Sequence, residues 1–139
     1  MLDNDLYAPL GLALREEKQR IAHKLLDQKK FSLDLSAGGG YWSSLMHIAV
    51  AKLDVKTVVK LIMRKADPDA HDVKNGDRPL HTLMNVYQKN TVAAKKILGF
   101  LVEAGANINS KNNEQWTPLH LAVKKGHLDA VESFLAYKS

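Results

Sequence analysis

Apolar residues recur along the chain at the spacing of one face of a helix. Residues three and four positions apart lie on the same side of an α-helix, so such a stretch predicts a helix with one buried stripe. Four stretches follow this rule: Ile21, Leu25 and Leu26; Val58, Leu61 and Ile62; Leu98, Leu101 and Val102; and Val131, Phe134 and Leu135. A shorter segment precedes each of them: Ala8-Pro9-Leu10-Gly11, Ser44-Leu45-Met46-His47, Arg78-Pro79-Leu80-His81 and Thr117-Pro118-Leu119-His120. The pattern predicts helix pairs in series.

The last short segment has the residue types that begin a helix. Thr117 can cap a helix, Pro118 suits its first turn, and Leu119 and Ala122 share one face. This segment resembles the ankyrin repeat, whose signature is Thr-Pro-Leu-His-x-Ala at a period of about 33 residues. The resemblance implies an all-α solenoid of stacked antiparallel helix pairs with projecting β-type turns. We expect Leu119 and Leu121 to lie in its core.

The resemblance covers nearly the whole chain, as one domain of four repeats. Their approximate boundaries are residues 4–36, 40–73, 74–110 and 111–139, and the first repeat is degenerate. One helix pair has no surface against which to bury its apolar face except the next pair, so stability resides at the interfaces between repeats. We expect the domain to be a fragment of a longer protein.

The composition fits one domain with neither disulfides nor a membrane anchor. The 139 residues are 45% hydrophobic and include no cysteine, which excludes a disulfide framework and thiolate metal sites. The sequence has no apolar stretch of about 18 residues, and it begins with acidic residues where a secretory signal would be basic. We therefore expect a monomer in the cytoplasm or nucleus.

Two segments depart from the family pattern. The third repeat carries six extra residues, which we place around residues 87–92, with Thr91 as a new N-cap. The insertion either contributes to a binding face or is a neutral change of loop length. Gly38, Gly39 and Gly40 are predicted to extend the turn before the second repeat. In that turn Tyr41 and Trp42 either pack beneath the backbone or form a contact surface.

The motif histidines His47, His81 and His120 are interpreted as structural. In the family, this imidazole bonds the motif threonine and the backbone of the adjoining turn, and Thr117 and Pro118 complete that motif here. Successive repeats stand about 10 Å apart, which is too far for the three rings to bind one zinc ion. Because Arg78 replaces the threonine in the third repeat, we expect that repeat to be the least regular.

The sequence contains no catalytic constellation. It lacks the Gly-x-Ser-x-Gly and His-Glu-x-x-His motifs, and its carboxylates are scattered over predicted turns and exposed helical positions. The glycine run is followed by neither Lys-Ser nor Lys-Thr, so it does not resemble a nucleotide-binding loop. We predict a protein that is not an enzyme and requires no cofactor or metal.

The resemblance implies a binding surface on the concave face. In this family, partners usually contact the tips of the turns and the exposed side of the first helices, while the second helices form the convex back. Aromatic residues beside Lys or Arg are typical of contact hot spots, although a tryptophan before Thr-Pro can instead pack across the turn. The predicted contact residues, termed the partner row, are Tyr41, Trp42, Lys52, Lys74, Asn75, Asp77, Asn85, Asn113, Trp116, Lys124 and Lys125.

The net charge of +5 favours an acidic partner. We interpret the chain as a non-catalytic interaction module and scaffold that binds a protein or peptide. One alternative is a small stand-alone inhibitor that resembles the four-repeat cyclin-dependent kinase inhibitors. Another is a basic module that binds phosphoinositide or nucleic acid. The lysines are spread over all repeats rather than gathered in a stripe, which disfavours nucleic acid.

Overall fold

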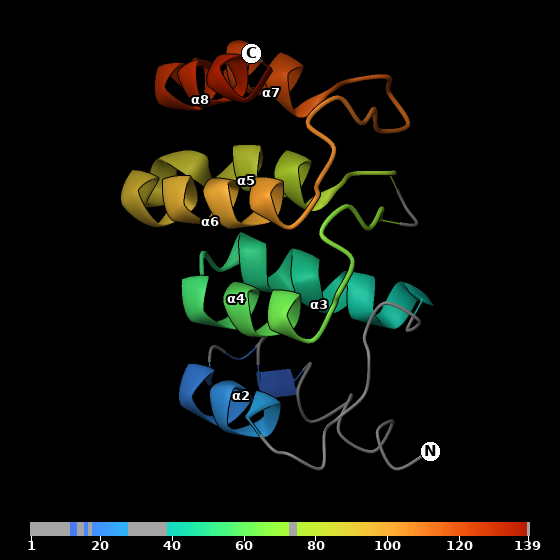
Figure 1. The fold of residues 1–139 in the computed structure, drawn as a ribbon, viewed down its shortest axis with the longest axis vertical. Helices are drawn as coiled ribbons and strands as arrows, with labels where there is room; N and C mark the ends of the chain where they lie inside the picture. Colours follow the sequence, from blue (N-terminus) through green and yellow to red (C-terminus); the bar gives the residue numbers. More distant parts are fainter. Residues whose placement is uncertain (1–11, 14–15, 17, 28–38, 73–74, 139) are drawn as a thin grey trace.

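The computed structural model describes residues 12–13, 16, 18–27, 39–72 and 75–138, and excludes the side chains of Leu26, Lys138 and residues 39–44. Helices are stacked from the N-terminal to the C-terminal end (Figure 1). Their bounds are Gln19–Leu26 (α2), Gly39–Ala51 (α3), Val55–Met63 (α4), Pro79–Val86 (α5), Thr91–Glu103 (α6), Pro118–Lys125 (α7) and Leu128–Lys138 (α8), with a 3₁₀ turn at Tyr87–Lys89 (η3). No strand occurs in these ranges, and the predicted all-α class is confirmed.

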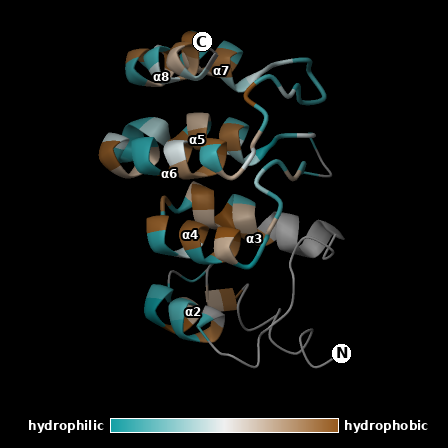
Figure 2. Ribbon diagram, in the orientation of Figure 1, coloured by the Kyte–Doolittle hydropathy of each residue, from teal (hydrophilic) through white to brown (hydrophobic). Residues whose placement is uncertain are grey.

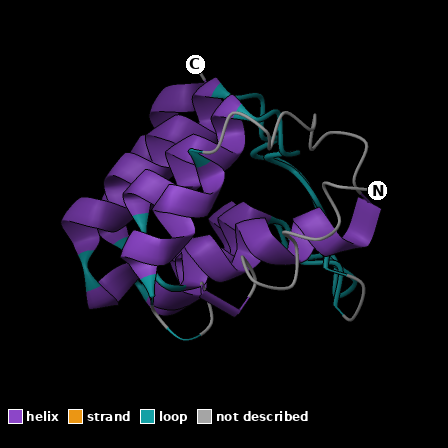
Figure 3. Cartoon of the chain, turned by 90° about the horizontal axis from the view of Figure 1, so that it is seen from below, coloured by secondary structure: helices purple, strands orange, loops and turns teal. Residues whose placement is uncertain are grey.

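In the second, third and fourth repeats, the first helices pack against one another. Helix α3 contacts α5, and α5 contacts α7, while α2, α4 and α6 form a second row beside them. The antiparallel pairs α3 with α4, α5 with α6, and α7 with α8 complete the stack. Seen along the stack, the helices overlie one another and the connecting loops project to one side (Figure 3).

The core runs as a strip through the stack rather than as one central ball. Apolar segments lie on every helix from α3 to α8 (Figure 2). Met46 and Leu80, which share a motif position with Leu119, are fully buried. Leu119 and Leu121 are partly buried, and both pack against this core. In the described part of the chain, no helix lies beyond α7 and α8 at this end of the stack.

The motif prolines begin helices in the last two repeats. Pro118 follows Thr117, whose hydroxyl accepts a hydrogen bond from the His120 amide at 3.2 Å. Pro79 likewise begins α5, and the His81 ring accepts the amide hydrogen of Arg78 at 2.9 Å. Arg78 has the same extended backbone as Thr117, so this helix start is regular although the threonine is missing.

The predicted glycine turn is partly helical, so the placement of Gly39, Gly40, Tyr41 and Trp42 in a turn is wrong. Helix α3 already begins at Gly39, six residues before the position that proline occupies in the later motifs. A proline disfavours helical backbone in the residue before it, and repeat two has Leu45 there instead. Without that barrier the helix extends toward the N-terminus. Gly38 lies outside the described residues.

The insertion of the third repeat lies between α5 and α6. Its residues form η3, and helix α6 then begins at Thr91. The N-cap is Asn90, whose side-chain oxygen accepts the amide hydrogen of Ala93 at 3.1 Å, so the prediction of Thr91 as the cap is wrong by one residue. Asn and Thr both cap helices, and the sequence alone left the choice between neighbours open.

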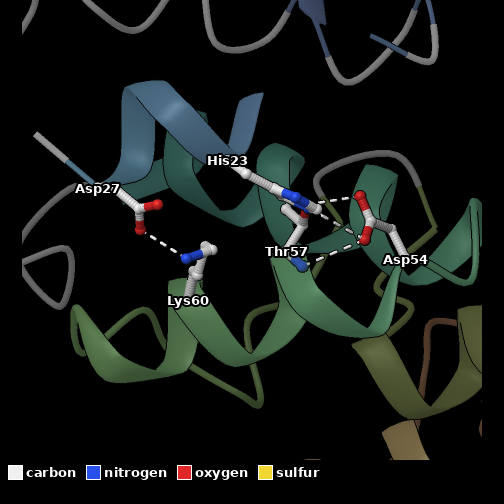
Figure 4. Close-up of polar contacts among 5 residues, drawn as sticks. All are labelled: His23, Asp27, Asp54, Thr57 and Lys60. Atoms are coloured by element: carbon white, nitrogen blue, oxygen red, sulfur yellow. Dashed lines mark hydrogen bonds and ion pairs between the residues drawn. The ribbon is translucent and has the colours of Figure 1, made fainter. Parts of the chain in front are cut away.

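Two polar contacts hold α2 against α4 (Figure 4). The His23 ring donates to the carboxylate of Asp54 at 3.3 Å, and this buried carboxylate also caps α4 through the amide of Thr57 at 3.2 Å. On the exposed side, Asp27 pairs with Lys60, and the hydrogen bond from that ammonium group lowers the pKa of Asp27. The Asp54 side chain thus caps α4 and also binds α2.

The turns between repeats are tied together by backbone hydrogen bonds. The Asn113 amide donates to the carbonyl of Asn75 at 2.9 Å, which joins two successive turns. Gly76, which follows Asn75, has a φ of +72°. A side chain at this position would place its Cβ 2.5 Å from Oδ1 and 3.0 Å from the backbone nitrogen of Asn113. Glycine is required there both for its backbone conformation and for space.

Replacing Gly76 by alanine should therefore destabilise the fold more than the same change at Gly126. Gly126 has a φ of +74°, but no atom lies within 4 Å of the point that a Cβ would occupy there. Gly126→Ala should cost about 1 to 2 kcal/mol from the left-handed backbone alone. Gly76→Ala should cost at least about 1 kcal/mol more because of overpacking. Urea denaturation of both variants measures the difference, and equal losses would contradict the contact between the turns.

Candidate functional site

The first helices place part of the partner row on exposed positions. Lys52 follows α3, Asn85 lies in α5, and Lys124 and Lys125 end α7, and all four side chains are exposed. Since α3, α5 and α7 pack side by side, these positions lie near the C-terminal ends of neighbouring first helices. Lys74 and the side chains of Tyr41 and Trp42 lie outside the described residues.

Trp116 joins the last turn to helix α7. The ammonium group of Lys124 lies over its ring, 4.7 Å from the centroid. The ring of His120 meets it edge-on, with the centroids 6.2 Å apart. Trp116 is half-buried, so it packs across the turn and still presents part of its surface to solvent. An exposed cation beside an accessible aromatic ring is suited to contacts with acidic and apolar groups of a partner.

The polar residues at the turn tips differ in their exposure. The side chains of Asn75 and Asn113 are exposed. Asp77 is half-buried, and its carboxylate accepts a hydrogen bond from the Asn112 side chain at 2.9 Å. This contact connects the turns of successive repeats. A role of Asp77 in partner binding stays a prediction.

Two motif histidines connect successive repeats. His47 donates to the carbonyl of Asp77 at 2.9 Å, and His81 donates to the carbonyl of Trp116 at 2.7 Å. The His81 side chain is fully buried, and this burial lowers its pKa, although the Trp116 carbonyl acts in the opposite direction. His81 therefore holds the turn that carries Trp116.

Asp69 also links the turns between successive repeats. Its carboxylate accepts a hydrogen bond from the Ser110 hydroxyl at 3.1 Å, and its carbonyl accepts one from the Arg78 guanidinium at 2.8 Å. Burial raises the pKa of Asp69 despite the Ser110 hydrogen bond. Arg78 thus replaces the motif threonine with a contact to the preceding turn.

Sequence reasoning missed the role of His127. Its ring is buried, donates to the Met84 carbonyl at 2.8 Å, and accepts from the Gln88 amide at 3.0 Å. The ring also stacks on Tyr87, with the centroids 5.2 Å apart. These partners belong to the end of α5 and to the inserted η3 turn. The insertion is therefore bound to the fourth repeat, and the only sequence signal was the Gly126-His127 pair beside the motif.

The described residues contain no group of three or more His, Asp or Glu side chains placed to hold a metal ion. Within the same ranges, no helix has both the length and the apolar character needed to cross a membrane.

The comparisons with known proteins agree with this architecture. The family model described as ankyrin repeats (3 copies) matches residues 45–139, so the chain belongs to the ankyrin-repeat family, a class of non-catalytic protein-interaction modules. The chain is 32% identical over 128 residues to the nuclear factor NF-kappa-B p105 subunit of Gallus gallus, which covers 91% of the chain and 12% of that protein.

Two further relatives belong to the same family. The B-cell lymphoma 3 protein homolog of Mus musculus is 27% identical over 135 residues, covering 96% of the chain and 29% of that protein. Ankyrin repeat domain-containing protein 53 of Macaca fascicularis is 40% identical over 55 residues, covering 40% of the chain and 11% of that protein. The chain therefore spans less than a third of the length of each of these relatives.

Removing the His127 side chain should weaken the junction between the third and fourth repeats. His127→Ala leaves the Met84 carbonyl without this donor and opens a cavity beside Tyr87, which should cost about 2 to 4 kcal/mol. The matched change His120→Ala removes an exposed ring and should cost about 1 kcal/mol or less. Chemical denaturation checks both values, and a larger loss at His120 would contradict the assigned roles.

Burial of neutral His81 also predicts a pH dependence of stability. The lowered pKa means that the unfolded chain binds a proton at the ordinary value of 6.5 more readily than the folded chain does. The contribution of neutral His81 to the free energy of unfolding is fully present above this pH and is lost as the pH falls below it. The free energy of unfolding should fall between about pH 7.5 and 5.5. His81→Gln should flatten this slope. An unchanged slope in His81→Gln would assign the effect to other groups.

Proposed function

We propose that the chain is a non-catalytic module of the cytoplasm or nucleus that binds an acidic protein or peptide through the partner row. The observation that carries the proposal is the contact of Lys124 with Trp116 on an exposed surface next to Lys125. The ring supplies apolar contact area with little side-chain entropy to lose, and the two ammonium groups attract carboxylates.

The supports beneath this surface favour the same function. His81 and Asn112 both bond the Trp116 backbone, through its carbonyl and amide groups respectively. A fixed backbone lowers the entropy lost when a partner binds. Lys52 and Asn85 extend the surface along α3 and α5, so that an extended segment could contact several repeats at once.

Affinity capture tests the proposal with a pair of variants that remove equal charge. Lys124→Ala with Lys125→Ala removes two cations from the partner row. Lys95→Ala with Lys96→Ala removes two exposed cations from α6, a second helix. A partner protein captured at moderate salt should bind at least about ten-fold more weakly to the first variant, and within about two-fold of normal to the second.

The salt dependence separates this function from the electrostatic one. If both variants lose binding equally, and moderate salt releases only nucleic acid or acidic lipid, the protein-binding function of the row is wrong. A partner retained equally by both variants would place the contact elsewhere on the molecule.

A further inference from the structure

The positive charge of the described helices lies mainly on the second helices. Helices α3 and α5 contain no Lys, Arg, Asp or Glu, and the charged residues of α7 are Lys124 and Lys125. Helices α2, α4 and α6 carry two cations each against one carboxylate, that of Glu103; the cations are Arg20, Lys24, Lys56, Lys60, Lys95 and Lys96. Helix α8 exposes Asp129 and Glu132, so the basic surface ends at α6. Lysines that are dispersed along the sequence are thus gathered by the fold.

The exposed stripes of these three helices lie side by side. Residues three and four positions apart share one face of a helix. Such stripes are Arg20 and Lys24 on α2, Lys56, Lys60 and Met63 on α4, and Val92, Lys96 and Phe100 on α6. Helix α2 packs against α4 and α4 against α6, in the order seen in Figure 1. The exposed sides of α2, α4 and α6 therefore form one surface, termed the basic face.

Apolar side chains are exposed among the cations of the basic face. Met63 is 76% exposed, Val92 is 67% exposed and Phe100 is 39% exposed. Met63 ends α4, Val92 lies at the start of α6, and Lys96 separates Val92 from Phe100. The apolar residues are therefore single points on a basic surface rather than one continuous stripe.

This combination of charge and apolar points fits a lipid surface better than a helix or a nucleic acid. An amphipathic helix binds through a continuous row of apolar anchors, which the basic face does not offer. A nucleic-acid backbone supplies phosphates but no apolar medium for Met63. A bilayer with anionic headgroups attracts Lys and Arg, and its interfacial region takes up separate apolar side chains.

We propose that the basic face docks on a membrane surface that contains anionic lipids. The charge complementarity survives the internal ion pair, because Asp27 pairs with Lys60 and the five other cations still outnumber Glu103. Met63 and Phe100 enter the interfacial region while the cations contact headgroups. The basic face belongs to the second helices and the partner row to the first helices and turns, so this inference does not rest on the proposed function.

Vesicle co-sedimentation tests the charge of the basic face with two pairs of substitutions. The vesicles are phosphatidylcholine with about 30% phosphatidylserine, and each Lys or Arg near such a surface contributes about 1 kcal/mol. Lys95→Ala with Lys96→Ala should therefore weaken binding at least about ten-fold. Lys124→Ala with Lys125→Ala removes the same charge from α7 and should stay within about two-fold of the unsubstituted chain. All four side chains are exposed, so the fold should be retained in both.

A second pair of substitutions tests the apolar contacts. Met63→Gln keeps the size of the side chain but makes it polar, and it should weaken vesicle binding at least about three-fold. The control is Val123→Gln, because Val123 is 62% exposed but lies on α7. Binding of soluble polyphosphate should be unchanged by Met63→Gln, since a free polyanion offers no apolar interface.

Three results would overturn the proposal. The first is binding to phosphatidylserine vesicles no stronger than to vesicles of phosphatidylcholine alone. The second is an equal loss of vesicle binding in the two lysine pairs, or no effect of Met63→Gln, either of which would reduce the binding to overall charge. The third is capture of an acidic protein that depends on Lys95 and Lys96 while the vesicles stay unbound, which would assign the basic face to a protein partner.

Discussion

The interface between successive repeats is the interaction on which the rest of the structure depends. A single helix pair leaves one apolar face open, and here α5 closes that face by packing between α3 and α7. Polar contacts fix the register of this packing, because His47 and His81 each donate to a carbonyl in the following repeat. The hydrophobic contacts supply most of the stability, and the directional hydrogen bonds determine which turn lies above which.

This constraint also explains how a chain of short helices can form a defined surface. The carbonyl that accepts from His81 belongs to Trp116, so the inter-repeat link and the exposed aromatic residue share one backbone position. Lys124 then lies over that ring from the following helix. The same logic connects the insertion to the stack, because His127 contacts both the end of α5 and Gln88 of η3. Surface features are thus held by contacts that serve the fold.

Local sequence chemistry predicted the helix starts of the last two repeats, because Pro79 and Pro118 act within a few residues. It failed at the start of α3. The glycine run indicated a turn, but Leu45 stands in place of the motif proline, so the preceding residues can be helical. The role of His127 was not predictable in this way, because its acceptor, Met84, lies 43 residues earlier in the sequence. The sequence analysis assigned Lys124 and Trp116 to the same partner row, but it did not predict that their side chains are in contact. Partner identity has no motif in this fold, since it depends on surface side chains that the core does not constrain.

Native-state hydrogen exchange in His81→Ala tests most directly whether the inter-repeat links hold the stack together. His81 lies in α5, while its acceptor lies in the turn that leads into α7. If stability resides at the interfaces, the protection of amides in α5 and α7 should fall together. Loss of protection in α5 alone, with α7 unchanged, would show that the repeats are stable independently and would contradict this account.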